Sequence, residues 1–97
     1  MPRTIRYVDA WVGARVQLRR RELGLSQTAL GEMLGVSFQQ VQKYEKGRNR
    51  VSAGMLYEIS KALDVPVGYF FEDFEEPRAA LSRNQRSPLR SGRDTPV

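Results

Sequence analysis

Apolar residues recur at helical spacing through most of this chain, and serines or glycines interrupt the pattern where helices would begin and end. Two such segments follow one another closely within residues 25–47. The first should begin at Ser26, because a serine hydroxyl can accept a hydrogen bond from a free backbone N–H at a helix start. It should end at Gly35, which readily adopts a left-handed conformation. The second should run from Ser37 to Gly47, and so short a turn between two helices predicts a steep crossing that leaves the second one projecting.

Three further helices are expected around this pair. Helical periodicity predicts one helix over about residues 9–23, another from Ser52 to near Leu63, and a short last helix starting at Pro66. Gly31, in the middle of the first central helix, should cost about 1 kcal/mol relative to alanine. A residue without a Cβ makes sense there if the next helix crosses very closely. The expected fold is therefore all-α with five helices.

The chain divides by composition into three expected segments. Residues 1–8 form an extended N-terminal arm that carries Arg3 and Arg6, and residues 9–74 form the helical domain. Residues 75–97 are rich in Pro, Ser, Arg and Gly and poor in apolar side chains. Such a composition cannot offset the entropy lost on ordering, so we expect a basic, disordered C-terminal tail.

The second central helix has a distinctive outer face. Val41 and Tyr44 define its inner face at about 100° per residue. The opposite face carries Gln39, Gln42, Lys43 and Lys46, with Phe38 at the exposed N-terminal flank. Amides can bond base edges and ammonium groups can neutralise phosphate, although many Gln/Lys helix faces are simply solvated. The basic loop that follows, Arg48-Asn49-Arg50, favours the nucleic-acid interpretation.

Composition excludes several classes of function. The chain has no Cys and no His, which removes thiolate and imidazole metal sites, Cys nucleophiles, His-based triads and disulfides. The carboxylates Glu32, Glu45, Glu58 and Asp64 are scattered along helix faces and suggest no paired-carboxylate site, so an enzyme is not expected. We expect no cofactor and no metal. Apolar runs are short, so neither a transmembrane span nor a secretory segment is expected, and a cytoplasmic location follows by default.

The charge distribution favours a polyanionic partner. The net charge is +5, and 13 of the 16 cationic side chains are Arg, the side chain best matched to phosphate. Residues 72–76 carry four carboxylates, whereas residues 77–97 carry five Arg and one Asp. A basic balance alone does not separate nucleic acid from an anionic membrane surface. No helix has the amphipathic character of a membrane-surface helix, so a membrane partner is not expected.

Residues 67–74 form the most aromatic stretch of the chain. About half of it should close the core. The rest should form an exposed apolar patch, and such patches usually mark association surfaces. We expect a homodimer with Tyr69, Phe70 and Phe74 in its interface.

Several of these residues together resemble the lambda-repressor-like (Cro/C1, XRE) helix-turn-helix family. The resemblance rests on Gly24-Leu-Ser-Gln-Thr-Ala-Leu-Gly-Glu-Met-Leu-Gly-Val-Ser, on Val41-Gln-Lys-Tyr-Glu-Lys-Gly47 and on Leu63-Asp-Val-Pro-Val. It covers roughly residues 10–73. It implies a five-helix domain, here residues 9–74, whose third helix enters the major groove of double-stranded DNA.

The resemblance and the helix faces together suggest roles for individual residues. The expected base-reading residues are Phe38, Gln39, Gln42 and Lys43. The expected phosphate-binding residues are Ser26, Gln27, Ser37, Lys46, Arg48, Asn49 and Arg50. Arg20 and Glu45 fall where some members of the family bury an Arg–Glu pair, which implies a structural role for Glu45.

Phe38 departs from the family pattern. Well-known repressors carry Gln at this position, where it reads a base and bonds the residue that corresponds to Gln27. Phenylalanine can do neither, but it could pack on a thymine methyl group. The family's recognition pattern is therefore not expected to hold unchanged at this position.

The sequence leads to one main hypothesis and one alternative of another class. The main hypothesis is a cytoplasmic, nucleoid-associated, homodimeric and sequence-specific transcriptional regulator that binds an inverted repeat, more often as a repressor than as an activator. The alternative is an antitoxin that binds a toxin protein and regulates its own gene through the same motif. The C-terminal tail is the discriminating region, since antitoxins commonly wrap their partners with a terminal segment.

Overall fold

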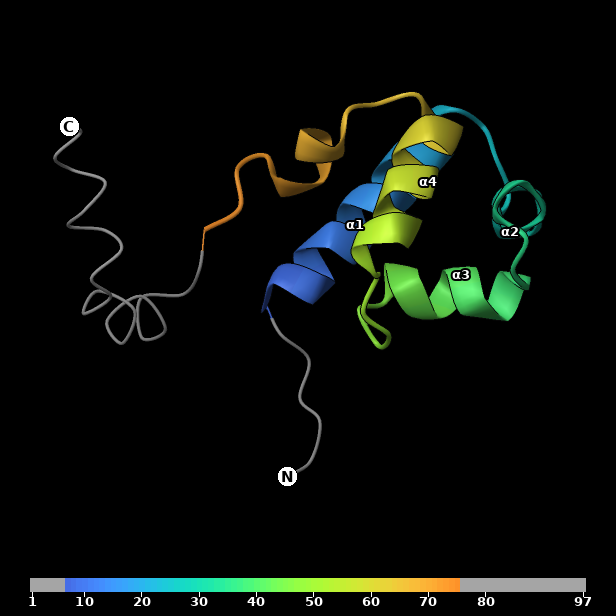
Figure 1. Cartoon of the computed structure of the whole chain (residues 1–97), viewed down its shortest axis with the longest axis horizontal. Coiled ribbons are helices and arrows are strands. Elements are labelled where there is room, and N and C mark those ends of the chain that lie inside the picture. The colour runs from blue at the N-terminus through green and yellow to red at the C-terminus, as the bar shows by residue number, and fades with distance from the viewer. Residues whose placement is uncertain (1–6, 76–97) are drawn as a thin grey trace, which may run out of the picture.

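The computed structural model describes residues 7–75, and within them every regular element is helical (Figure 1). The elements are α1 (Tyr7–Glu22), α2 (Gln27–Leu34), α3 (Phe38–Glu45), α4 (Ala53–Leu63) and the 3-10 helix η1 (Val67–Phe71). The predicted all-α class is confirmed for this part of the chain. The predictions for the arm and the tail concern residues 1–6 and 76–97, which lie outside the described residues.

Two predictions are wrong, one about the type of the last helix and one about the boundary of the N-terminal arm. The fifth α-helix is instead the 3-10 helix η1, in which the Tyr69 N–H donates to the Pro66 carbonyl at 2.9 Å. A 3-10 helix takes only three residues per turn, which suits a five-residue segment that follows a proline and contains Gly68. At the other end, α1 begins at Tyr7, so Tyr7 and Val8 belong to the helix and not to the predicted arm.

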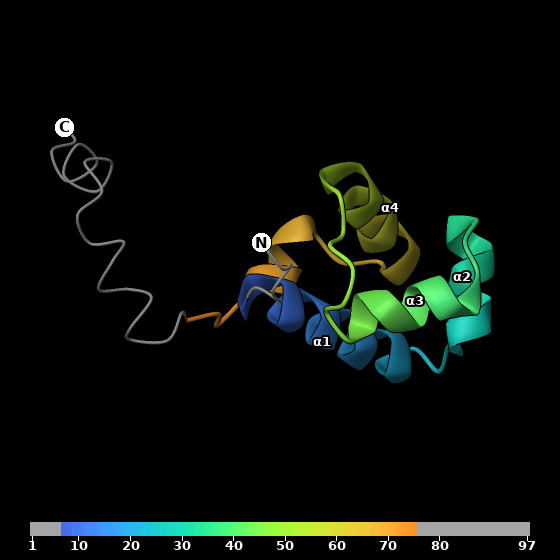
Figure 2. The ribbon, with the colours of Figure 1, turned by 90° about the horizontal axis from the view of Figure 1, so that it is seen from below.

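The serine caps form as the sequence predicts. The hydroxyl oxygens of Ser26, Ser37 and Ser52 each accept a hydrogen bond from the backbone N–H three residues further on, at 2.9, 3.1 and 3.0 Å. Gly35 ends α2 in the left-handed region with φ of 77°. The turn between α2 and α3 is therefore confined to residues 35–37, and both views of the ribbon show these helices crossing steeply (Figures 1 and 2).

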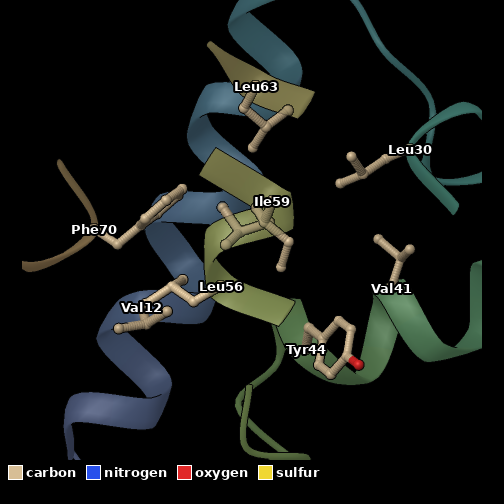
Figure 3. Packing of buried hydrophobic residues seen from close by; sticks show 9 residues of the cluster. Val12, Leu30, Val41, Tyr44, Leu56, Ile59, Leu63 and Phe70 are labelled. Atoms are coloured by element: carbon tan, nitrogen blue, oxygen red, sulfur yellow. The ribbon is translucent and has the colours of Figure 1, made fainter. Parts of the chain in front are cut away.

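All five elements contribute to one hydrophobic core, with Ile59 of α4 near its centre (Figure 3). Its buried members are Val12, Val16, Leu30, Val41, Tyr44, Leu56, Ile59, Leu63 and Phe70. Val41 and Tyr44 come from α3, so the inner face of α3 is tied to the same core as the rest of the domain. The opposite face of α3 is thereby directed away from the core.

Two glycines mark places where backbone segments meet directly. A Cβ atom on Gly31 would lie 2.6 Å from the Val36 carbonyl oxygen. The close approach predicted at Gly31 is thus present, although its partner is the turn and not the body of the next helix. A Cβ atom on Gly13 would lie 2.3 Å from the Tyr44 carbonyl oxygen, which brings α1 against the end of α3. The position of α3 is therefore fixed at both ends.

Candidate nucleic-acid interface

Helix α3 lies at the edge of the molecule. It runs along the lower margin in Figure 1, and it lies in front when the molecule is seen from below in Figure 2. No other described element covers it in that second view. A short helix held this way can enter a groove that admits one helix, as the major groove of B-DNA does.

The side chains of α3 separate into a buried and an exposed set. Val41, Tyr44 and Glu45 are buried. Gln39, Lys43 and Lys46 are exposed, and Gln42 is half-buried at the margin. Phe38, the first residue of the helix, is 45% exposed, although it is large and apolar. The structure therefore places all the predicted base-reading residues at the surface; that they read bases stays a prediction.

The loop after α3 is fixed against the start of α1. The Arg48 N–H donates to the Lys43 carbonyl at 2.9 Å and so caps the end of α3. Gly47 has φ of 72°, and a Cβ atom there would lie 2.9 Å from the Cα atom of Ala10. Both features restrain the loop backbone, so the cations that it carries are presented from a defined position.

The predicted phosphate-binding side chains of this loop differ in their surroundings. Arg48 is exposed, and Asn49 is half-buried. Arg50 is also exposed, but its Nε lies 3.4 Å from Asp9 Oδ2, and the two side chains form an ion pair. Since Asp9 belongs to α1, far from Arg50 in the chain, no local sequence pattern could have revealed this pair.

Glu45 lies at the centre of a buried polar cluster. Its carboxylate accepts hydrogen bonds from Arg20 Nε at 2.6 Å and Arg20 Nη2 at 3.0 Å, and both side chains are over nine-tenths buried. The Arg–Glu pair that the family resemblance implied is thus present. Two amides also donate to the same carboxylate, Gln27 Nε2 at 3.0 Å and Gln17 Nε2 at 3.3 Å.

The sequence does not predict the contacts that Gln27 and Gln17 make with Glu45. Gln27 is a predicted phosphate-binding residue, yet its amide nitrogen bonds the buried carboxylate of Glu45. The sequence assigns no role to Gln17. The available signal was its spacing, because it lies three residues before Arg20 and therefore on the same face of α1.

The two serines predicted to bind phosphate act as helix caps in the structure. The oxygens of Ser26 and Ser37 accept backbone hydrogen bonds, which leaves each hydroxyl hydrogen available as a donor. Both residues are exposed at the starts of α2 and α3. A cap of this kind is compatible with a phosphate contact, which remains a prediction.

The prediction for the aromatic segment is wrong in one residue. Phe70 is completely buried in the core, so it cannot supply surface to a dimer interface. Its orientation follows from contacts between α1 and the backbone on either side of Phe70. Arg15 Nε and Nη2 donate to the Tyr69 carbonyl at 3.2 and 3.1 Å. Trp11 Nε1 donates to the Glu72 carbonyl at 3.1 Å. These bonds hold the backbone of η1 with Phe70 facing inward.

The other aromatic residues of this segment lie at or near the surface. The Arg15 guanidinium lies 4.0 Å from the centroid of the half-buried Tyr69 ring, and the half-buried Phe74 ring is 6.1 Å from that of Trp11. Val67 and Phe71 are 36% and 43% exposed. The largest apolar exposure in η1 is therefore at Val67 and Phe71, which were not predicted as interface residues.

Comparison with known proteins identifies the family. A family model described as helix-turn-helix matches residues 16–70, more than half of the chain. The chain belongs to the Cro/C1-type helix-turn-helix family. Members of this helix-turn-helix family are DNA-binding proteins that regulate transcription. Among residues 7–75, no helix is long and apolar enough to cross a membrane.

Curated relatives in the helix-turn-helix family are close in sequence. An uncharacterized transcriptional regulator in the ATPase CF(0) region of Rhodospirillum rubrum is 60% identical over 78 residues, covering 78% of this chain and 72% of that protein. An uncharacterized HTH-type transcriptional regulator of Sinorhizobium medicae (strain WSM419) is 61% identical over 66 residues, covering 68% of this chain and 48% of that protein. The chain thus spans about half the length of several relatives that it matches.

Solved structures of the helix-turn-helix family share the arrangement of the helices. The P22 c2 repressor in complex with a synthetic operator matches with a TM-score of 0.60 and 32% identity, over 65% of this chain and 96% of that chain. The restriction-modification controller protein C.AhdI of Aeromonas hydrophila matches with a TM-score of 0.61 and 29% identity, over 64% of this chain and 94% of that chain.

Proposed function

We propose that this protein is a transcriptional repressor that binds an inverted-repeat operator as a homodimer and inserts α3 into the major groove. The observation that carries the proposal is the exposed face of α3, where Gln39 and Lys43 point away from the core while Glu45 anchors the helix from behind. The P22 c2 repressor, whose structure was solved with an operator, supports it as a structural neighbour. The site of action would be the nucleoid in the cytoplasm.

The roles that we propose follow from chemistry and position. Lys43, Gln39 and Gln42 bond base edges, and the exposed ring of Phe38 packs on the methyl group of a thymine. The residues that face the phosphate backbone and fix the register are Lys46, Arg48, Asn49, Arg50 and the capping serines Ser26 and Ser37. Arg48 is the residue in the loop best suited to phosphate alone, because it is exposed and its backbone is fixed by the bond to Lys43.

For the dimer, we propose an interface on the exposed side of η1. Val67 and Phe71 offer apolar surface there, with Tyr69 and Phe74 at its margin. Two protomers paired through this region would each present one α3. The antitoxin alternative depends on the tail, and no feature of residues 7–75 favours it.

Selection from random double-stranded oligonucleotides by the purified full chain tests this function directly. We expect the selected sequences to converge on an inverted repeat whose half-sites are about 10 base pairs apart, since two recognition helices must be about 34–36 Å apart to enter successive major grooves. Selected sequences without two-fold symmetry would contradict the homodimeric mode. If the bound oligonucleotides remained random in sequence after repeated rounds at near-physiological salt, sequence-specific binding would be contradicted.

Substituting Lys43 and Arg48 separately should distinguish base contacts from phosphate contacts. Lys43→Ala should weaken binding to the selected operator by about 1–3 kcal/mol and relax the choice at one base pair. Arg48→Ala should weaken binding to operator and random duplex alike, and it should reduce the slope of log affinity against log salt by about one unit. Titrations of both variants at several salt concentrations provide the measurement. If both substitutions weakened binding to the operator and to the random duplex equally, the assignment of Lys43 to base reading would be wrong.

A further inference from the structure

We propose that Gln27 is a positioning residue for α3, which sets the angle at which α3 meets DNA and thereby contributes to the choice between sequences. Gln27 is the first residue of α2, and its Nε2 donates to Glu45 Oε1 at 3.0 Å. Glu45 is the last residue of α3. The bond therefore joins the beginning of α2 to the end of α3. This inference rests on the proposed DNA-binding function.

The acceptor of this bond is well suited to hold a helix in place. The side chain of Glu45 is 1% exposed, so its carboxylate has little access to water and depends on the donors around it. Arg20 and Gln17 of α1 supply three of the N–H donors, at 2.6, 3.0 and 3.3 Å. Gln27 supplies a donor from α2. The end of α3 is consequently held from two helices at a single carboxylate.

The geometry of α2 and α3 explains why this contact affects orientation. At its beginning, α3 is joined to α2 by the turn at residues 35–37, where the Val36 N–H donates to the Gly31 carbonyl at 2.9 Å. At its end, α3 is joined to α2 through Gln27 and Glu45. Phe38 and Glu45 are about 10 Å apart along the helix axis at 1.5 Å per residue. Arg20 and Gln17 hold the far end of α3 against α1. The Gln27 bond adds an attachment to α2 at that same end, so the direction of α3 relative to α2 is fixed at two separated points.

Contacts to base edges tolerate only small displacements of the side chains that make them. Side chains that read base edges must be held to within about 0.5 Å of the productive geometry. Lys43 lies two residues before Glu45, close to the end that Gln27 holds. Arg48 lies in the loop beyond, whose backbone is fixed separately against Ala10 by Gly47. Loss of the Gln27 bond should therefore disturb base contacts more than the phosphate contact of Arg48.

This role differs from a simple phosphate contact and from simple support of the fold. A phosphate contact would affect every duplex equally. A structural role would lower thermal stability without changing the preference for operator over random duplex. A positioning role lowers the ratio of operator affinity to random-duplex affinity, while the Arg20–Glu45 pair keeps the protein folded.

The experiment compares three variants of the full chain on the selected operator and on a random duplex of equal length. Gln27→Met keeps the length of the side chain but removes the donor. Gln17→Met removes the matching donor to the same Glu45 oxygen from α1 and is the control. Gln27→Lys retains an N–H donor for Glu45. Thermal melting of each variant shows whether it is folded at the temperature of the titrations.

We expect Gln27→Met to lower the ratio of operator to random-duplex affinity about tenfold, with random-duplex binding changed less than twofold. Gln17→Met and Gln27→Lys should each keep the ratio within about twofold of that of the original chain. An unchanged ratio with Gln27→Met, whether binding to both duplexes falls equally or to neither, would overturn the inference. Titrations of the original chain test the proposed function separately. If the original chain bound operator and random duplex with equal affinity, the proposed function would be wrong, whatever the variants show.

Discussion

Replacing Glu45 with leucine is expected to lower the free energy of unfolding by about 3–5 kcal/mol, the range observed when one partner of a buried ion pair is removed. The substitution leaves the Arg20 guanidinium more than nine-tenths buried without its carboxylate. It also leaves the amide nitrogens of Gln17 and Gln27 without the oxygen that they share. A buried donor without an acceptor has lost its hydrogen bonds to water and gained none in the protein. The resulting free-energy penalty is larger than the net stabilisation from an intact hydrogen bond.

Thermal melting of the Glu45→Leu variant provides the measurement. For a domain of 60–100 residues, each kcal/mol corresponds to a shift of about 4–8 °C, so we expect a fall of at least about 12 °C. Glu58→Leu, on the exposed side of α4, is the matched control and should change the melting temperature little. The double variant Arg20→Met with Glu45→Leu should recover much of the loss, since it removes both charges. A melting temperature for Glu45→Leu close to that of Glu58→Leu would show that the pair is not buried.

The parts of the fold that the sequence predicts well are those with local causes. Ser26, Ser37 and Ser52 cap the helices that they were expected to cap, because the bond joins a hydroxyl to a backbone N–H only three residues away. Gly35 ends α2 because the left-handed conformation is a property of that one residue. The same holds for the faces of α3, since an eight-residue helix with Val41 and Tyr44 inside must turn Gln39 and Lys43 outward.

The errors arise where contacts between distant residues decide the outcome. Phe70 and Phe71 are adjacent and chemically identical, yet one is completely buried and the other 43% exposed. The difference is set by η1 docking on α1, through bonds from Arg15 and Trp11 that no pattern within residues 67–74 contains. A stretch of aromatic residues shows that some must be buried, but only the packing partner determines which.

The same limitation applies to the candidate site. Gln27 has the position and chemistry of a phosphate-binding residue, and the sequence offers no reason to connect it with Glu45, eighteen residues further on. The family resemblance implied that Glu45 pairs with Arg20, and that part was confirmed. Because one buried carboxylate can accept several hydrogen bonds, its remaining partners follow only from the three-dimensional arrangement. The Asp9–Arg50 pair likewise depends on the loop after α3 reaching α1.

A second large loss of stability is expected for Gly13→Ala, at about 3 kcal/mol, the upper end of the usual cost of overpacking. The new Cβ atom would lie 2.3 Å from the Tyr44 carbonyl oxygen and 2.7 Å from that of Glu45. Both obstructing atoms belong to the backbone of α3, so neither can be relieved by a change of rotamer. The helices α1 and α3 must separate, which also weakens the hydrogen bonds between Arg20 and Glu45.

Gly54→Ala in α4 is the matched control, because nothing lies within 4 Å of the position that its Cβ would take. Alanine has the higher helix propensity, so this variant should be more stable than the original chain by about 0.5–1 kcal/mol. The urea concentrations at the midpoints of unfolding should therefore shift in opposite directions, downward for Gly13→Ala and upward for Gly54→Ala. If the midpoint of Gly13→Ala also shifted upward, α1 and α3 would have to lie further apart than the distances at Gly13 indicate. The contact between α1 and the end of α3 would then depend on side chains, chiefly the Arg20–Glu45 pair.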